Sequence, residues 1–110
     1  MPGMTQPTIA PQTLLSTSAQ ASLRCPRIER LLEAARCGDA QAYYELGSAY
    51  ALGEGVDIDL IEAHRWYNLA ALAGVKSAQA ERAALAADMA PTEIAEAQRL
   101  AREWIAALGH

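Results

Sequence analysis

The stretch GDAQAYYELGSAYALGEGVDIDLIEAHRWYNLAALAG, residues 38–74, decides the fold. Its first half places larger apolar side chains at Tyr43, Leu46 and Tyr50, which is the spacing of one helix face. Its second half repeats this spacing in four further residues, which are Ala63, Trp66, Tyr67 and Ala70. Glycines stand at both ends and between the halves. The stretch therefore predicts a hairpin of two helices joined by a glycine-containing loop.

Polar residues and glycines mark the ends of these two helices. Asp39 suits the N-cap of the first helix, because its carboxylate can accept from free backbone N–H groups. Gly53 can end that helix in the left-handed conformation, and Gly55 permits a second unusual backbone angle. Asp59 and Glu62 have the spacing of a capping box, so we expect the second helix to begin near Asp59.

Gly47 lies inside the first predicted helix, where glycine costs about 1 kcal/mol relative to alanine. It shares the stripe of Tyr43, Leu46 and Tyr50, so we expect the partner helix to approach closely at this position. Alanines opposite large aromatic residues favour such an approach. Trp66 is therefore predicted to lie in the core, whereas Tyr67 is expected to expose its hydroxyl group.

The two ends of the stretch resemble each other. Ala34-Ala35-x-x-Gly38 recurs as Ala70-Ala71-x-x-Gly74, 36 residues later. One helical hairpin per unit of this length indicates a solenoid built from repeats.

The glycines, alanines and aromatic residues of this stretch have a spacing that resembles the Sel1-like repeat. This repeat is a relative of the tetratricopeptide repeat with a longer inter-helix loop. One full repeat carries most of the resemblance, which spans roughly residues 28–85. Its signature residues are Gly38, Leu46, Gly47, Tyr50, Gly53, Gly55, Asp59, Ala63, Trp66, Tyr67, Ala70, Ala71, Gly74 and Ala78. The sequence departs at Asp57, where the family often has proline. The resemblance implies an all-α, right-handed α-solenoid used as a scaffold for protein contacts, and it implies no enzyme or cofactor.

The rest of the chain is organised around this repeat. Residues 1–24 are rich in Pro, Thr, Ser and Gln and are predicted to be disordered, whereas residues 25–110 are predicted to form the repeat domain. A helix from Pro26 to Cys37 resembles the second helix of an incomplete preceding repeat. Ser77 is expected to cap a third repeat helix that runs to about Ala87, and Pro91 to begin a divergent C-terminal capping helix over 91–108.

That last helix has its own apolar stripe, which comprises Ile94, Ala97, Ala101, Trp104, Ile105 and Leu108. One full repeat with a half unit on each side is close to the lower limit for a stable solenoid. We therefore expect either that the flanking helices supply the missing burial, with Trp104 as the anchor, or that the protein self-associates.

Composition excludes several classes of protein. The formal net charge is −4 over 110 residues and no basic run offsets it, so we expect no nucleic-acid partner. No apolar run approaches the roughly 20 residues of a membrane span, and the N-terminus does not read as a signal peptide. These features predict a cytoplasmic protein. Cys25 and Cys37 have neither a disulfide framework nor zinc spacing, and a bridge between them is not expected.

Motifs that resemble catalytic or ligand sites have simpler structural interpretations. Gly53-x-Gly55 follows a helix and lacks the third glycine of a dinucleotide site. Asp57, Asp59 and Glu62 do not follow the EF-hand pattern, and capping explains the last two. His64 has no nucleophile or acid at an evident spacing. We therefore expect no catalytic, cofactor-binding or metal-binding residue.

The exposed face of the first hairpin helix is the better functional candidate. Its residues are Gln41, Tyr44, Glu45, Ser48 and Leu52. The resemblance implies that the first helices of such repeats line a concave surface on which partners bind. The protein is therefore predicted to be a non-enzymatic adaptor or assembly scaffold for a partner protein of unknown identity. The other interpretation, which the sequence leaves open, is that these residues are simply solvated.

Two rival functions also stay open at this stage. The first is a self-associating structural module, a homodimer joined through the apolar flank formed by Ile61, Leu69 and Leu72. The second is an enzyme of the β-lactam-hydrolysing type, to which cysteine-rich members of the resembled family have been linked. This chain lacks their regular cysteine pairs, and a nitrocefin assay tests the idea directly.

Overall fold

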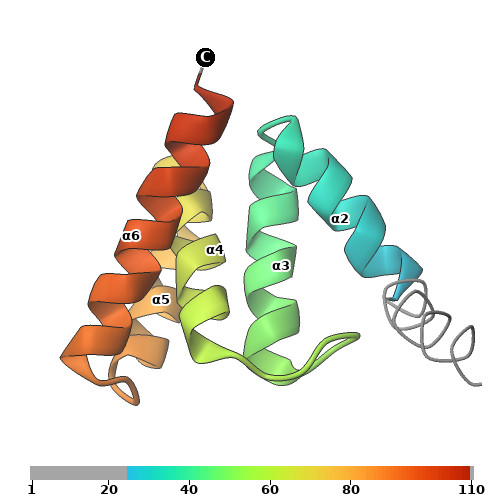
Figure 1. Ribbon diagram of the computed structural model, residues 1–110. Coiled ribbons are helices and arrows are strands. Elements are labelled where there is room, and N and C mark those ends of the chain that lie inside the picture. Colours follow the sequence, from blue (N-terminus) through green and yellow to red (C-terminus); the bar gives the residue numbers. More distant parts are fainter. Residues whose placement is uncertain (1–24, 110) are drawn as a thin grey trace, which may run out of the picture.

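The computed structural model describes residues 25–109, and these residues form five helices (Figure 1). Residues 1–24, where disorder is predicted, and His110 lie outside the described residues. The helices are α2 (Pro26–Arg36), α3 (Ala40–Leu52), α4 (Leu60–Leu72), α5 (Ser77–Ala86) and α6 (Pro91–Leu108). The all-α class predicted from the hairpin pattern is confirmed.

Neighbouring helices pack as hairpins, with α2 against α3, α3 against α4, and α4 against α5. The last helix, α6, also packs mainly against α4, and Figure 1 shows the two side by side. Helix α4 is therefore the central element, since three of the other helices rest on it. This stacking of hairpins is repeat-like, while the right-handed sense of a longer solenoid stays a prediction.

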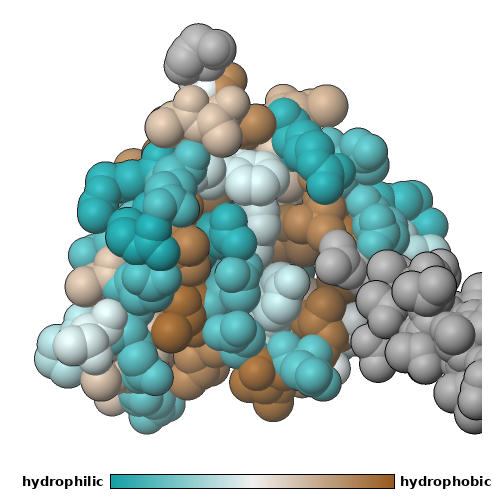
Figure 2. Space-filling model, in the orientation of Figure 1, coloured by the Kyte–Doolittle hydropathy of each residue, from teal (hydrophilic) through white to brown (hydrophobic). Residues whose placement is uncertain are grey.

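The core is centred on α4, whose buried residues are Ala63, His64, Trp66, Tyr67, Leu69 and Ala70. Trp66 is 1% exposed, as its place in the stripe predicts. Its ring stacks on Tyr43 of α3 at a centroid distance of 5.9 Å and meets the edge of Trp104 of α6 at 4.9 Å. Aromatic pairs of this kind contribute about 0.5–1.5 kcal/mol beyond the area they bury. Figure 2 shows hydrophobic residues gathered between the helices and hydrophilic residues in bands along them.

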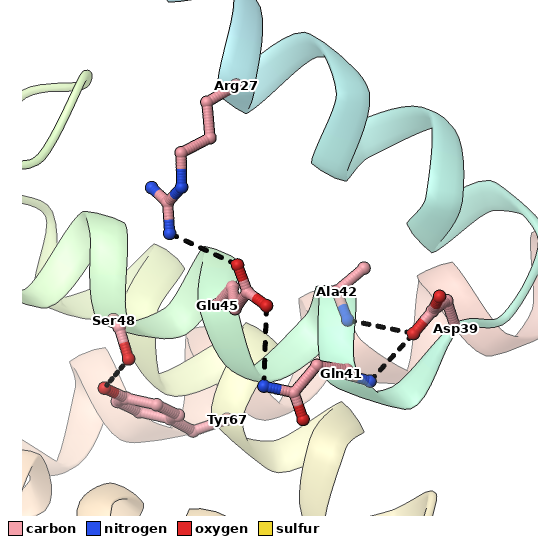
Figure 3. A network of polar contacts seen from close by, with 7 residues as sticks. All are labelled: Arg27, Asp39, Gln41, Ala42, Glu45, Ser48 and Tyr67. Carbon is pink, nitrogen blue, oxygen red and sulfur yellow. Dashed lines mark hydrogen bonds and ion pairs between the residues drawn. The ribbon is translucent and has the colours of Figure 1, made fainter.

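The expected ends of α3 are confirmed. The Asp39 carboxylate accepts from the backbone N–H groups of Gln41 at 2.9 Å and Ala42 at 3.1 Å (Figure 3). Gly53 ends α3 with φ of 75°, and its N–H donates to the Ala49 carbonyl. Since a side chain is strained at such a φ, glycine is the residue that fits this position.

Two predicted caps differ from the structure. The Asp59 carboxylate accepts from the Glu62 N–H at 3.1 Å, but the Glu62 carboxylate accepts from Arg65 and Trp66 instead of returning a bond to Asp59. Only half of the capping box forms, because the Glu62 carboxylate accepts hydrogen bonds from the side chains of Arg65 and Trp66. Ser77 is the first residue of α5 and not its cap, since Lys76 holds the N-cap position without a side-chain bond.

Helix α6 joins the core through part of its predicted stripe. Ala97 and Ala101 are buried, and Trp104 packs against the core cluster. Ile105 and Leu108 are 46% and 39% exposed, so the stripe does not reach the core at its C-terminal turn. The helix therefore buries its middle against α4 and leaves apolar side chains open at its end.

Candidate functional site

A groove with a volume of about 470 Å³ lies between α3 and α5, above α4. Its lining residues come from these three helices and the turn after α5, and they are Tyr44, Ser48, Ala51, Leu52, Tyr67, Glu81, Ala84, Leu85 and Asp88. Because α3 and α5 both pack against α4, the same packing that forms the core also sets the width of the groove.

Tyr67 of α4 forms the floor of the groove. It is 3% exposed, and its hydroxyl shares a hydrogen bond of 3.0 Å with the Ser48 hydroxyl. The expectation that Tyr67 exposes its hydroxyl is therefore wrong, because Ser48 of the neighbouring helix α3 covers this hydroxyl and forms a hydrogen bond with it. Burial raises the pKa of Tyr67, and the nearby carboxylates Glu81 and Glu54 raise it further.

The approach of α3 to α4 at this floor depends on Gly47. A Cβ atom at this position would lie 2.6 Å from the ring of Tyr67, which is far inside contact distance. The absence of a side chain at Gly47 therefore lets the Tyr67 ring pack against α3, where its hydroxyl reaches Ser48. The predicted close approach of the partner helix is confirmed.

Apolar side chains line both walls of the groove. Leu52 is 65% exposed, and Leu85 faces it as a half-buried residue of α5. The Tyr44 ring rests on Tyr67 at a centroid distance of 5.5 Å, and its hydroxyl donates to Glu81 at 3.4 Å. An exposed leucine beside an aromatic ring offers apolar area that a binding partner can cover.

The structure separates the five predicted face residues into two groups. Tyr44, Ser48 and Leu52 line the groove, whereas Gln41 and Glu45 do not. The Glu45 carboxylate accepts from Arg27 of α2 at 3.3 Å and from Gln41 at 3.5 Å (Figure 3). An exposed ion pair of this kind contributes little to stability. These two residues therefore link α3 to α2 and lie away from the groove.

Sequence reasoning missed the α5 side of the groove. Glu81, Leu85 and Asp88 have the i, i+4, i+7 spacing of one helix face, and this spacing was the available signal. This spacing alone does not indicate a binding surface, because α5 loses the repeat signature after its first residues. Ala84 adds a small exposed residue to the same wall.

His64 is a buried polar residue outside the groove. It is 3% exposed, and its Nδ1 has no hydrogen-bond partner among residues 25–109. Burial lowers its pKa, and the nearby charge of Arg82 lowers the pKa further. With no group bonded to Nδ1 to orient or activate the ring, the geometry favours a structural role for this histidine.

Other reactive groups in residues 25–109 lie apart from one another. Cys25 and Cys37 are free thiols, Cys37 exposed and Cys25 half-buried. Within this range, no group of three or more His, Cys, Asp or Glu side chains is placed to hold a metal ion.

The described helices include none that is long and apolar enough to cross a membrane. The cytoplasmic location expected from the sequence stays a prediction.

Hairpins stacked around a central helix, with a groove between α3 and α5, define a small all-α protein of repeat-like architecture. No known family model matches the chain. The chain is similar to the alginate biosynthesis protein AlgK of Azotobacter vinelandii, with 38% identity over 66 residues. The matched part is 60% of this chain and 14% of AlgK. This partial likeness fits a helical repeat protein, and membership of the Sel1-like family stays a prediction.

Proposed function

We propose that this protein is a non-enzymatic protein-interaction module, and that the groove between α3 and α5 receives a segment of a partner protein. The observation that carries the proposal is Leu52, which stays 65% exposed at the edge of a groove of about 470 Å³. When a partner covers a large apolar side chain beside a concave surface, the burial of apolar area makes a favourable contribution to the free energy of binding.

The size of the groove sets the kind of contact. A volume of this order holds a few side chains, so a short segment of the partner is its natural occupant. Tyr44 supplies a rigid amphipathic surface of the type that is enriched at interaction hot spots. We expect modest affinity from one such contact, which tandem or multivalent presentation would raise.

The likeness to AlgK concerns one segment of that protein. The name of AlgK places that protein in alginate biosynthesis, and the match covers 14% of its length. We take from it a shared segment that fits a helical repeat protein, and neither a pathway nor a partner.

The structure also decides which variants test the groove cleanly. Tyr44→Ala combined with Ser48→Glu would disturb the buried Tyr67 that both side chains contact. Leu52 and Ala84 are exposed, so they can be changed with little effect on the core. Leu72, which is 67% exposed but does not line the groove, is a matched control for Leu52.

A photo-crosslinking amino acid placed at position 52 or at position 72 tests the proposal in cells. We expect a discrete protein adduct from position 52, and we expect Ala84→Arg to remove it by filling the groove with a long charged side chain. Position 72 should give no such adduct. Thermal unfolding of Ala84→Arg serves as the folding control. Equal adducts from both positions, or an adduct at position 52 that survives Ala84→Arg, would show that the groove is not the binding surface.

A further inference from the structure

The groove carries negative charge that the described part of the chain does not neutralise. Glu81 and Asp88 line it, and Glu54 lies close enough to act on the Tyr67 hydroxyl. Among residues 25–109, none of these three carboxylates forms an ion pair. Glu81 accepts one hydrogen bond from the Tyr44 hydroxyl, and the Asp88 side chain has no partner in the same range.

The cation nearest in sequence does not offset this charge. Arg82 follows Glu81 directly, but its Nη1 donates to Asn68 of α4 at 2.5 Å, and it does not line the groove. The guanidinium is therefore held by α4. A cleft with one sign of charge and apolar walls attracts ligands of the opposite charge.

Glu81 of α5 and Asp88 of the turn after α5 stand on either side of an apolar residue in the sequence. All three residues, Glu81, Leu85 and Asp88, line the groove. Leu85 faces Leu52 across the groove. A ligand that fits this pattern needs an apolar side chain for the leucines and a positive charge for a carboxylate beside them.

We propose that the occupant of the groove is a peptide segment in which a lysine or arginine lies within one helical turn of a large apolar residue. This inference rests on the proposed function and adds the chemistry of the partner. An acidic segment would meet two carboxylates, beside which the described residues lining the groove place no cation, and a second copy of this chain would bring a net charge of −4 toward them.

A selection from a phage library of random dodecapeptides tests this inference without knowledge of the natural partner. The wild-type protein is the bait, and Leu52→Ser, which removes the apolar side chain without adding charge, is the counter-selection. We expect the enriched peptides to share a lysine or arginine next to a large apolar residue. The best of them is then synthesised with a fluorescein label, and its Kd is measured by fluorescence polarisation.

We expect the double variant Glu81→Gln/Asp88→Asn to weaken this peptide's binding at least about threefold, since each exposed ion pair contributes a fraction of a kcal/mol. Raising the salt concentration should weaken wild-type binding in the same direction. Glu33→Gln/Glu103→Gln removes the same charge from exposed sites outside the groove and should leave the Kd unchanged.

The outcomes separate this inference from the proposed function. Peptides that lose binding with Leu52→Ser but contain no basic residue, or that bind the Glu81→Gln/Asp88→Asn variant equally well, would overturn the inference and leave the groove proposal intact. Enriched peptides that bind Leu52→Ser as well as wild type, or no enrichment at all, would count against both.

Discussion

Gly47 lies where α4 comes close to the backbone of α3. Glycine weakens a helix by about 1 kcal/mol relative to alanine, so alanine would be the better residue if local propensity decided. The ring of Tyr67 decides instead, because a Cβ at Gly47 would lie 2.6 Å from it. The tyrosine is 3% exposed and bonded to Ser48, so it has little room to move.

We expect Gly47→Ala to destabilise the protein by about 1–2 kcal/mol, because overpacking costs more than the helix propensity returns. Urea unfolding measures this change. In a Tyr67→Leu background, where the ring is absent, the same substitution should be neutral or stabilising. Equal destabilisation in both backgrounds would show that the ring does not set the requirement for glycine.

His64 is the residue whose burial makes stability depend on pH near neutrality. Its pKa is lowered below the ordinary value of 6.5, first by burial and then by Arg82. The unfolded chain therefore binds a proton at His64 more readily than the folded chain does. The corresponding stability is fully present above pH 6.5 and is lost as the pH falls from 6.5 toward the folded pKa.

We expect the free energy of unfolding to fall as the pH drops below about 6.5, with a contribution from His64 of at most about 1.4 kcal/mol per pH unit. Denaturant unfolding at several pH values measures the slope. His64→Gln keeps a polar side chain of similar size without the titration, so its slope should be shallower. Identical slopes in the two proteins would show that His64 does not titrate differently in the folded state.

Single residues of the hairpin were predictable where their role is local. The Asp39 cap, the Gly53 terminus and the close approach at Gly47 all follow from spacing within one or two helices. The bonded hydroxyl of Tyr67 was not predictable, because it depends on which α3 side chain lies above it. Glu62 was misassigned because Arg65 and Trp66 compete for its carboxylate.

Among the helices, α6 depends most on one contact with a distant part of the chain. Trp104 meets Trp66 edge to face, and its Nε1 donates to the Tyr43 hydroxyl at 3.1 Å. These contacts join α6 to both helices of the predicted full repeat. The prediction that Trp104 anchors the last helix agrees with this geometry, and the next experiment tests its energetic weight.

We expect Trp104→Ala to destabilise the protein by about 3 kcal/mol, at the lower end for a large aromatic residue because the side chain is only partly buried. Equilibrium urea unfolding measures the change. Ile105→Ala, at the neighbouring residue that is 46% exposed, should cost less than about 1 kcal/mol. Similar losses for the two variants, or no change in melting temperature for Trp104→Ala, would contradict an anchoring role.

Helix α5 shows why the candidate site was only partly predictable. Its existence follows from the alanine-rich helical segment after Gly74, but its role as a wall of the groove does not. That role arises because α3 and α5 both pack on α4, which brings Leu52 and Leu85 together across many residues of sequence. The sequence pattern therefore identified Tyr44, Ser48 and Leu52 and missed the acidic wall opposite them.

At the scale of the whole molecule, the three residues of the predicted self-association flank differ in their exposure to solvent. Leu69 is buried, Ile61 is half-buried and Leu72 is 67% exposed. Exposed leucines that stand singly are common on monomeric proteins. The flank therefore offers less continuous apolar surface than the sequence pattern suggested.

We expect the protein without a bound partner to have the mass of a monomer, because its net charge of −4 and the discontinuous apolar surface of the flank oppose self-association. Light scattering coupled to size-exclusion chromatography, over a range of concentrations, measures this mass. Leu72→Glu is the matched variant and should have the same mass as wild type. A dimeric wild type that Leu72→Glu converts to a monomer would favour the self-associating alternative.

The groove between α3 and α5 is the central feature of the molecule, and one titration tests it most directly. The ¹⁵N-labelled protein is titrated with the partner segment that crosslinks at position 52, and amide chemical shifts are followed by NMR. We expect the largest changes at residues 44–52 and 81–88, with little change on α2 and α6. Changes confined to α2 or to the open end of α6, with the groove unaffected, would contradict the proposed binding surface.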